Sequence, residues 1–246
     1  MMKLDKQMII AHRGASGLVE HENTIEAFEK AVEVGADSIE CDVRKTKDGK
    51  IIVVHDEDYQ GKLIKDLSYQ DLSILTTANG FLMPTLEEAI LWCKDKIVID
   101  IELKEEGYEE EVIALVKKHL SCKDFLIRSF NDSSLKKIKR IDKNIKTVLL
   151  LGVEYPKWGL FTRLSELFPL LRVLKTKCDM VSPHYRLVRF GYVKRLKLWR
   201  KPVLVWTVND SKLMEKMLID KKVAGIITNF PDVAIRVLKE NKKSIA

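Results

Sequence analysis

The chain has 246 residues, of which 46% are hydrophobic and 32% charged, a balance typical of a soluble globular protein. No run approaches the roughly 18 apolar residues of a membrane span, and no apolar segment precedes the first predicted strand. We therefore expect a cytoplasmic protein without a signal peptide or transmembrane segment. The four cysteines form neither a C-x-x-C pair nor a zinc spacing, which indicates reduced, mostly buried thiols.

The formal net charge is +7, and a basic balance of this kind can serve binding to nucleic acid or to an anionic membrane. The lysines are spread over many predicted helical faces, and the denser run from Arg186 to Lys201 is typical of a solvated helix face. Because no basic-aromatic strand array or recognition helix is present, we expect no nucleic-acid partner. The apolar and basic stretch from Tyr155 to Arg172 is expected to pack against the fold, with peripheral membrane contact as the alternative.

Short β-rich runs alternate with helix-patterned segments along the chain. Strands are predicted at 7–12, 38–45, 96–103, 124–129, 146–151, 179–183, 202–208 and 224–228, and helices at 23–34, 85–94, 108–120, 132–141, 158–174, 188–199, 211–220 and 231–240. Eight such units predict an α/β fold, a (β/α)8 TIM barrel forming a single domain over residues 1–246. A doubly wound sheet is the alternative, but Gly14-Ala15-Ser16-Gly17 does not match the glycine-rich first turn that it usually needs.

The first strand runs directly into His12, Arg13 and Gly14, and the helix after it starts with Asn23 and Glu26, which resemble a capping box. In the second strand, period two places Ser38, Glu40 and Asp42 on the face opposite the apolar residues. Glu40 and Asp42 are then expected to point into the barrel near the carboxyl end of this strand. Two like charges there are costly unless a cation or hydrogen-bond donors compensate them.

A long connection follows the second strand. It holds an extra strand from Ile51 to Val54, then His55, and then a short insertion at 56–84. Connections of this kind lie at the barrel mouth, on the face where active sites form.

The third strand repeats the acidic pattern, with Asp100, Glu102 and Lys104 alternating with apolar residues. Neighbouring strands lie about 4.8 Å apart, so the second and third strands can bring Glu40, Asp42 and Glu102 together. This all-oxygen cluster suits one hard divalent cation, Mg²⁺ or Ca²⁺, with Mn²⁺ also open. A structural salt-bridge network is the alternative for the third strand.

Two histidines, His12 and His55, end apolar strands beside the predicted acidic cluster. One imidazole can remove a proton from a nucleophile while the other protonates a leaving alkoxide at a phosphorus centre. Arg13 and Lys104 can neutralise the phosphoryl oxygens. His184 follows the sixth predicted strand, where a hydrogen-bonded loop histidine is the expected role and a place in the lining of the barrel mouth is the alternative.

The ordered set of motifs from residue 9 to about 232 resembles the glycerophosphodiester phosphodiesterases. These motifs are His12-Arg13-Gly14, Glu22-Asn23-Thr24, Gly35 to Val43, Lys47-Asp48-Gly49, His55-Asp56, Pro84 to Glu88, Ile101 to Lys104, Val205 to Asn209 and Gly225 to Thr228.

The resemblance implies a barrel that hydrolyses a glycerophosphodiester to glycerol 3-phosphate and an alcohol. It implies that His12 and His55 are the catalytic acid–base pair, that Glu40, Asp42 and Glu102 bind one divalent metal, and that Arg13 and Lys104 contact the phosphate. It further implies that Trp206 packs on the substrate. Whether the vicinal hydroxyl of glycerol attacks first, giving a cyclic phosphate, stays open.

The sequence departs from the family pattern in three places. His21 stands where proline is common, Asn229 stands where aspartate is common, and residues 56–84 lack the usual Arg-Thr-Thr-type stretch. The headgroup preference therefore stays open. Lysophospholipase D-type activity on lysophospholipids and a catalytically weak headgroup-binding barrel are the alternatives.

Overall fold

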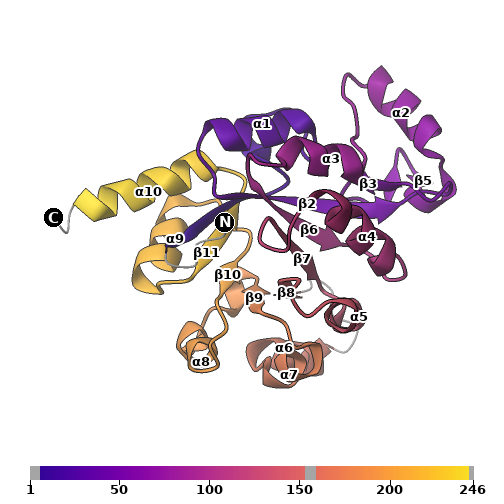
Figure 1. The fold of residues 1–246 in the computed structure, drawn as a ribbon. Coiled ribbons are helices and arrows are strands. Elements are labelled where there is room, and N and C mark those ends of the chain that lie inside the picture. The colour runs from indigo at the N-terminus through magenta and orange to yellow at the C-terminus, as the bar shows by residue number, and fades with distance from the viewer. Residues whose placement is uncertain (1–5, 153–158, 244–246) are drawn as a thin grey trace.

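The computed structural model describes residues 6–152 and 159–243, which form a parallel barrel surrounded by helices (Figure 1). The strand order is β10-β11-β1-β2-β6-β7-β8-β9, and two isolated bridges, Val181 to Val203 and His184 to Trp206, bring β9 back toward β10. The strands are β1 (Met8–Ala11), β2 (Ser38–Lys45), β6 (Val98–Leu103), β7 (Phe125–Ser129), β8 (Thr147–Leu151), β9 (Met180–Pro183), β10 (Leu204–Val205) and β11 (Gly225–Thr228). This nearly closed barrel confirms the predicted (β/α)8 fold.

The helices on the outside follow their strands in the expected alternation. They are α1 (Ile25–Glu33), α3 (Leu86–Cys93), α4 (Glu109–His119), α5 (Asp132–Ile141), α6 (Gly159–Leu167), α7 (Leu170–Thr176), α8 (Tyr192–Leu198), α9 (Ser211–Glu215) and α10 (Pro231–Lys243), with a π-helical turn at Lys216–Asp220 and 3-10 turns at Ser16–Leu18, Ile64–Asp66 and Tyr185–Leu187. Among the residues described, no helix combines the length and the hydropathy needed to cross a bilayer.

The insertion after β2 is more structured than the sequence suggested. Strand β3 (Ile51–Val53) pairs antiparallel with β2, and a hairpin of β4 (Asp58–Tyr59) and β5 (Lys62–Leu63) follows. Helix α2 (Tyr69–Ala78) then starts with a capping box between Ser68 and Asp71. The sequence missed α2 because only Leu72 and Thr76 of the helix are buried, so its apolar pattern is weak.

Three other predictions about local structure are wrong. The single helix predicted at 158–174 is two helices, because Pro169 has no amide hydrogen to continue α6; Trp158 lies outside the described residues. The strand predicted at 202–208 forms a regular ladder only at Leu204–Val205, with single bridges at Val203 and Trp206, and Pro202 cannot donate to a ladder. Thr24, not Asn23, caps α1 by accepting a hydrogen bond from the Ala27 amide.

Period two divides the strand side chains between two environments. The outward residues, such as Ile39, Cys41 and Ile101, pack against the helices in one large core. A smaller inner core fills the barrel floor with Met8, Ile10, Leu126, Val148, Met180, Leu204 and Ile227. The register pairs Glu40 with Asp100 and Asp42 with Glu102, so the acids of β2 and β6 stand side by side inside the barrel.

Candidate active site

A cavity of about 720 Å³ opens at the carboxyl ends of the strands. Every residue that the sequence predicted for the site lines it, namely His12, Arg13, Glu40, Asp42, His55, Glu102, Lys104 and Trp206. The wall also contains residues outside the predicted set: Arg128, Phe130, Leu150, Gly152, Arg163, His184, Arg186, Leu187, Arg189 and Ile227. The cavity is thus larger and more basic than the predicted set alone indicated.

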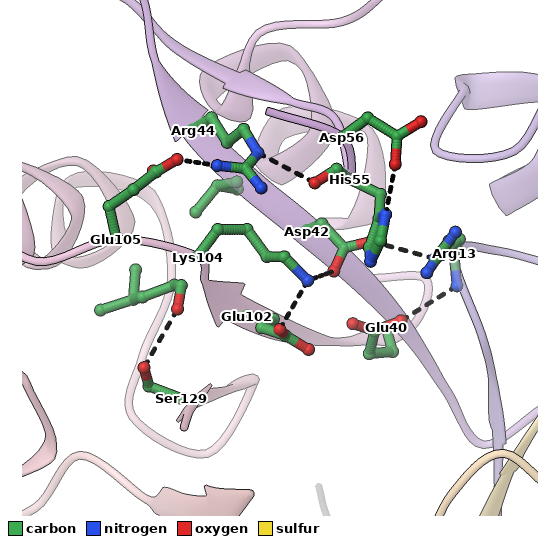
Figure 2. A network of polar contacts seen from close by, with 12 residues as sticks. Arg13, Glu40, Asp42, Arg44, His55, Asp56, Glu102, Lys104, Glu105 and Ser129 are labelled. Carbon is green, nitrogen blue, oxygen red and sulfur yellow. Dashed lines mark hydrogen bonds and ion pairs between the residues drawn. The ribbon is translucent and has the colours of Figure 1, made fainter. Parts of the chain in front are cut away.

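Three carboxylates form the floor of one half of this cavity. Glu40, Asp42 and Glu102 are buried, and one oxygen of each lies within 4.8 Å of the others. Figure 2 shows them converging from β2 and β6. Burial and the neighbouring Asp42 raise the pKa of Glu40 well above its usual range, because two anions share a site with little water. Burial also raises the pKa of Glu102, although Lys104 opposes this.

Two cations and one amide hold the carboxylates in place. Lys104 donates from Nζ to Asp42 Oδ1 at 3.2 Å and to Glu102 Oε1 at 2.8 Å. Arg13 Nε lies 3.2 Å from Asp42 Oδ2, and its backbone amide donates to Glu40 Oε2 at 3.1 Å. Although burial opposes it, the charges of Lys104 and Arg13 lower the pKa of Asp42 to about 2. Asp42 is therefore the fixed anion of the cluster.

A divalent metal ion fits this donor set. The buried Glu40 Oε1 has no hydrogen-bond partner among the described residues, so the lone pairs of this oxygen are available to a cation. The three ligands are all carboxylate oxygens, which are the donors that hard cations prefer. The buried cluster could therefore hold a metal between Glu40, Asp42 and Glu102.

Asn23 and Arg13 show how the loop after β1 reaches the acids. Asn23 donates from Nδ2 to Asp42 Oδ2 at 3.0 Å, and the Asp42 amide donates back to Asn23 Oδ1 at 3.3 Å. Both Arg13 and Asn23 have backbone φ in the left-handed region, at 53° and 57°. Non-glycine residues rarely adopt this conformation, and strain of this kind concentrates at functional sites. Sequence reasoning assigned Asn23 only a capping role, so this contact to Asp42 was missed.

The two histidines approach the carboxylates in different settings. His12 Nδ1 lies 2.7 Å from Asn229 Oδ1, and its Nε2 lies 4.0 Å from Glu40 Oε2. Burial, with a smaller contribution from the charge of Arg13, lowers the pKa of His12 to about 4, so this imidazole is neutral at neutral pH. His55 follows β3, and its Nδ1 lies 2.7 Å from Asp56 Oδ1 (Figure 2).

Asn229 and Arg128 are the most informative residues that the sequence did not assign to the site. Asn229 was noted as a departure from the family pattern, and its carbonyl oxygen accepts from His12. Arg128 is fully buried on β7 and forms an ion pair with Asp100, with Nε 2.8 Å from Oδ1. This pair identifies Asp100 as a structural partner beneath the cluster, the role that the salt-bridge alternative described.

An aromatic wall faces the carboxylates across the cavity. The Trp206 ring packs edge-on against Phe130 and His184, with centroid distances of 5.5 and 5.2 Å. Its Nε1 donates to the Ser182 carbonyl at 2.8 Å, which fixes the ring. His184 therefore lines the cavity, which was the alternative to the loop role expected for it.

Comparison with known proteins shows the family of the chain. Residues 12–233 match the family described as "Glycerophosphoryl diester phosphodiesterase family". A glycerophosphodiester phosphodiesterase of Caldanaerobacter subterraneus is 31% identical and aligns over 96% of this chain and 99% of its own. A crystal structure of a glycerophosphodiester phosphodiesterase from Parabacteroides distasonis has a TM-score of 0.81 at 29% identity, covering 96% of this chain and 98% of that one.

A more distant solved structure shows the same fold. It is a phosphodiesterase from Oleispira antarctica in complex with the product sn-glycerol-3-phosphate, with a TM-score of 0.79 at 24% identity over 96% of this chain and 98% of that one. The family match covers most of the chain. The chain belongs to the glycerophosphoryl diester phosphodiesterase family and is therefore an enzyme, a phosphoric diester hydrolase.

Proposed function

We propose that this enzyme hydrolyses glycerophosphodiesters to glycerol 3-phosphate and an alcohol, with His12 and His55 as the acid–base pair and a divalent metal at Glu40, Asp42 and Glu102. The observation that carries the proposal is the meeting of both histidines and all three carboxylates in one cavity. The names of the full-length relatives support the same substrate class.

The residues of the chain divide the chemistry between them. Arg13 and Lys104 stand beside the carboxylates, where their charges can hold two phosphate oxygens. The metal, Mg²⁺, Mn²⁺ or Ca²⁺, would add further neutralisation of the phosphoryl charge. One histidine takes the proton of the nucleophile, water or a glycerol hydroxyl, and the other gives a proton to the departing alkoxide. Trp206 supplies a flat apolar surface for the substrate.

Lysophospholipase D-type hydrolysis of lysophospholipids is the second candidate. The cavity wall also contains Phe130, Leu150, Leu187 and Trp206, which could accommodate the apolar part of such a lipid. A headgroup-binding barrel without catalysis has less support, because all five residues proposed for the chemistry and the metal are present in the cavity.

Release of glycerol 3-phosphate from glycerophosphocholine, measured with and without chelator, tests the first proposal. We expect turnover with at least one of Mg²⁺, Mn²⁺ and Ca²⁺ and its loss on chelation. Choline release from lysophosphatidylcholine in parallel assays separates the two candidates. Absence of turnover on both substrates with all three metals would overturn the catalytic proposal.

A further inference from the structure

The positive charge of the molecule is concentrated in one part of the chain. Residues 159–200 contain ten Lys and Arg and only two Asp and Glu, an excess of eight positive charges, whereas the whole chain has a formal net charge of +7. The remaining residues are therefore nearly neutral in sum. This segment comprises α6, α7, β9 and α8, and Figure 1 places these three helices next to one another on the outside of the barrel.

The same part of the chain exposes several large apolar side chains on α6, on α7 and in the segments that follow α6 and precede α8. The exposed fractions are high at Leu160 (72%), Phe161 (78%), Leu164 (45%), Phe168 (57%), Leu171 (79%), Leu174 (63%) and Phe190 (83%), and these seven residues are the α6–α8 apolar surface. Clusters of exposed apolar residues with polar surroundings mark interaction sites, whereas single exposed residues need no explanation.

Helix α6 is inverted relative to an ordinary surface helix. Glu166 is its buried residue, while Leu160, Phe161 and Leu164 are exposed. The buried Glu166 accepts from the Gly152 amide at 2.7 Å and from Arg163 at 2.9 Å. An amphipathic helix turns its apolar side toward the less polar of its two surroundings. The orientation of α6 thus indicates that its outer side faces something less polar than water.

Contacts between α6 and α8 make this surface continuous. Arg195 on α8 donates to the Leu167 carbonyl at 3.0 Å, and its guanidinium lies 4.9 Å from the centre of the Phe168 ring. The Tyr192 hydroxyl donates to the Glu166 carbonyl at 3.1 Å. The surface also borders the active-site cavity, because Arg163 on α6 and Arg189 next to Phe190 line its wall.

We propose that the α6–α8 apolar surface docks on an anionic membrane and holds the cavity mouth at the lipid headgroups. Leucine and phenylalanine side chains can enter the boundary between headgroups and acyl chains, while the surrounding Lys and Arg meet anionic lipids. A second copy of this chain is a poorer occupant, because each copy would present the same excess of positive charge to the other.

Cosedimentation of the full-length protein with vesicles tests the proposal. We compare phosphatidylcholine vesicles with vesicles in which about a third of the lipid is phosphatidylglycerol. The wild type should bind the anionic vesicles, and binding should fall at about 1 M salt, where the Debye length is about 3 Å. The double variant Phe161→Ser and Leu171→Ser should bind at least about tenfold more weakly.

Matched controls separate docking from folding and from self-association. Ile74→Ser with Leu91→Ser removes two apolar side chains that are 63% and 51% exposed on α2 and α3, and it should bind vesicles like the wild type. Phe161 and Leu171 do not line the cavity, so their double variant should keep its activity on soluble glycerophosphocholine. Equal binding by the two double variants, or binding to neutral vesicles as strong as to anionic ones, would overturn the proposal. So would absence of vesicle binding together with a dimer that Phe161→Ser and Leu171→Ser dissociates.

Discussion

His12 and His55 reach the same carboxylates with different partners. The amide oxygen of Asn229 is the partner of buried His12, while the carboxylate of Asp56 is the partner of the more exposed His55. Asn229 is 217 positions away from His12 in the chain, so only the closure of the barrel between β1 and β11 brings the two together. A neutral partner suits an imidazole that is kept uncharged by burial.

We expect His12→Ala and His55→Ala each to lower kcat by at least about 100-fold, because each removes one proton-transfer group. Steady-state release of glycerol 3-phosphate measures the loss, and circular dichroism checks that the fold is kept. His119→Ala is the control, since this histidine contacts Glu87 at 2.8 Å outside the cavity. Near-normal turnover in either variant would remove that histidine from the chemistry.

The carboxylate of Glu40 lies in an unfavourable position beside Asp42. Its replacement should therefore affect folding and metal binding differently. Without metal, Glu40→Gln should melt at the same or a higher temperature than the wild type, because it removes an anion from beside Asp42. Metal at about 100 times its Kd should add about 2.7 kcal/mol to the wild type, roughly 5–10 °C, and much less to the variant. Calorimetric titration gives the affinities directly.

Glu29→Gln, an exposed change on α1, should leave the metal response intact. An unchanged metal titration in Glu40→Gln would remove Glu40 from the ligand set.

At the scale of elements, the alternation of side chains along the strands was enough to place the site. The points at which predicted helices and strands are interrupted could not be predicted in the same way. The alternation in β2 and β6 fixed which acids face inward, and the parallel register then set them side by side. Helix α2 could not be predicted with the same strength, because it depends on packing against Ile52 and Ile64. The role of Asn23 depends on a left-handed backbone, which its residue type permits but does not require.

The turn between β1 and α1 depends on Gly14. Its φ is +79°, and a Cβ there would lie 2.6 Å from the backbone carbonyl carbon of Ala27 on α1. Gly14→Ala should therefore lower the free energy of unfolding by about 2 to 4 kcal/mol, and activity should fall because His12 and Arg13 precede the displaced turn. Urea unfolding followed by fluorescence measures the first effect.

Gly61→Ala is the matched control, because Gly61 also has a positive φ of +77° but nothing lies within 4 Å of the added Cβ. It should cost only about 1 to 2 kcal/mol from backbone strain. Equal losses in the two variants would show that the contact with α1 does not matter.

At the scale of the whole molecule, the pairing between neighbouring strands is not equally extensive around the barrel. β2 and β6 share six registered pairs, whereas β9 and the β10 region meet through isolated bridges. The organisation as one domain over 1–246 stays a prediction.

Amide exchange in the native state should distinguish these two joins. We expect the Val181 and Trp206 amides, which bond between the β9 and β10 regions, to be less protected than the Cys41 and Glu102 amides, which bond between β2 and β6, by roughly tenfold or more. Hydrogen exchange read by NMR measures this, and equal protection on both sides would contradict it.

The weaker join has a consequence for how the ring of strands can be taken apart. The first strand, β1, and the last strand, β11, are not adjacent along the chain, yet they are paired along four residues. Hydrogen bonds therefore close the barrel firmly between them. The weakest strand pairing lies elsewhere, between β9 and β10, which follow one another along the chain. A backbone cut near Arg200, between α8 and Pro202, would place new ends beside that pairing. The two fragments would stay paired through β1 and β11 and would part first along the side that carries Trp206 and His184.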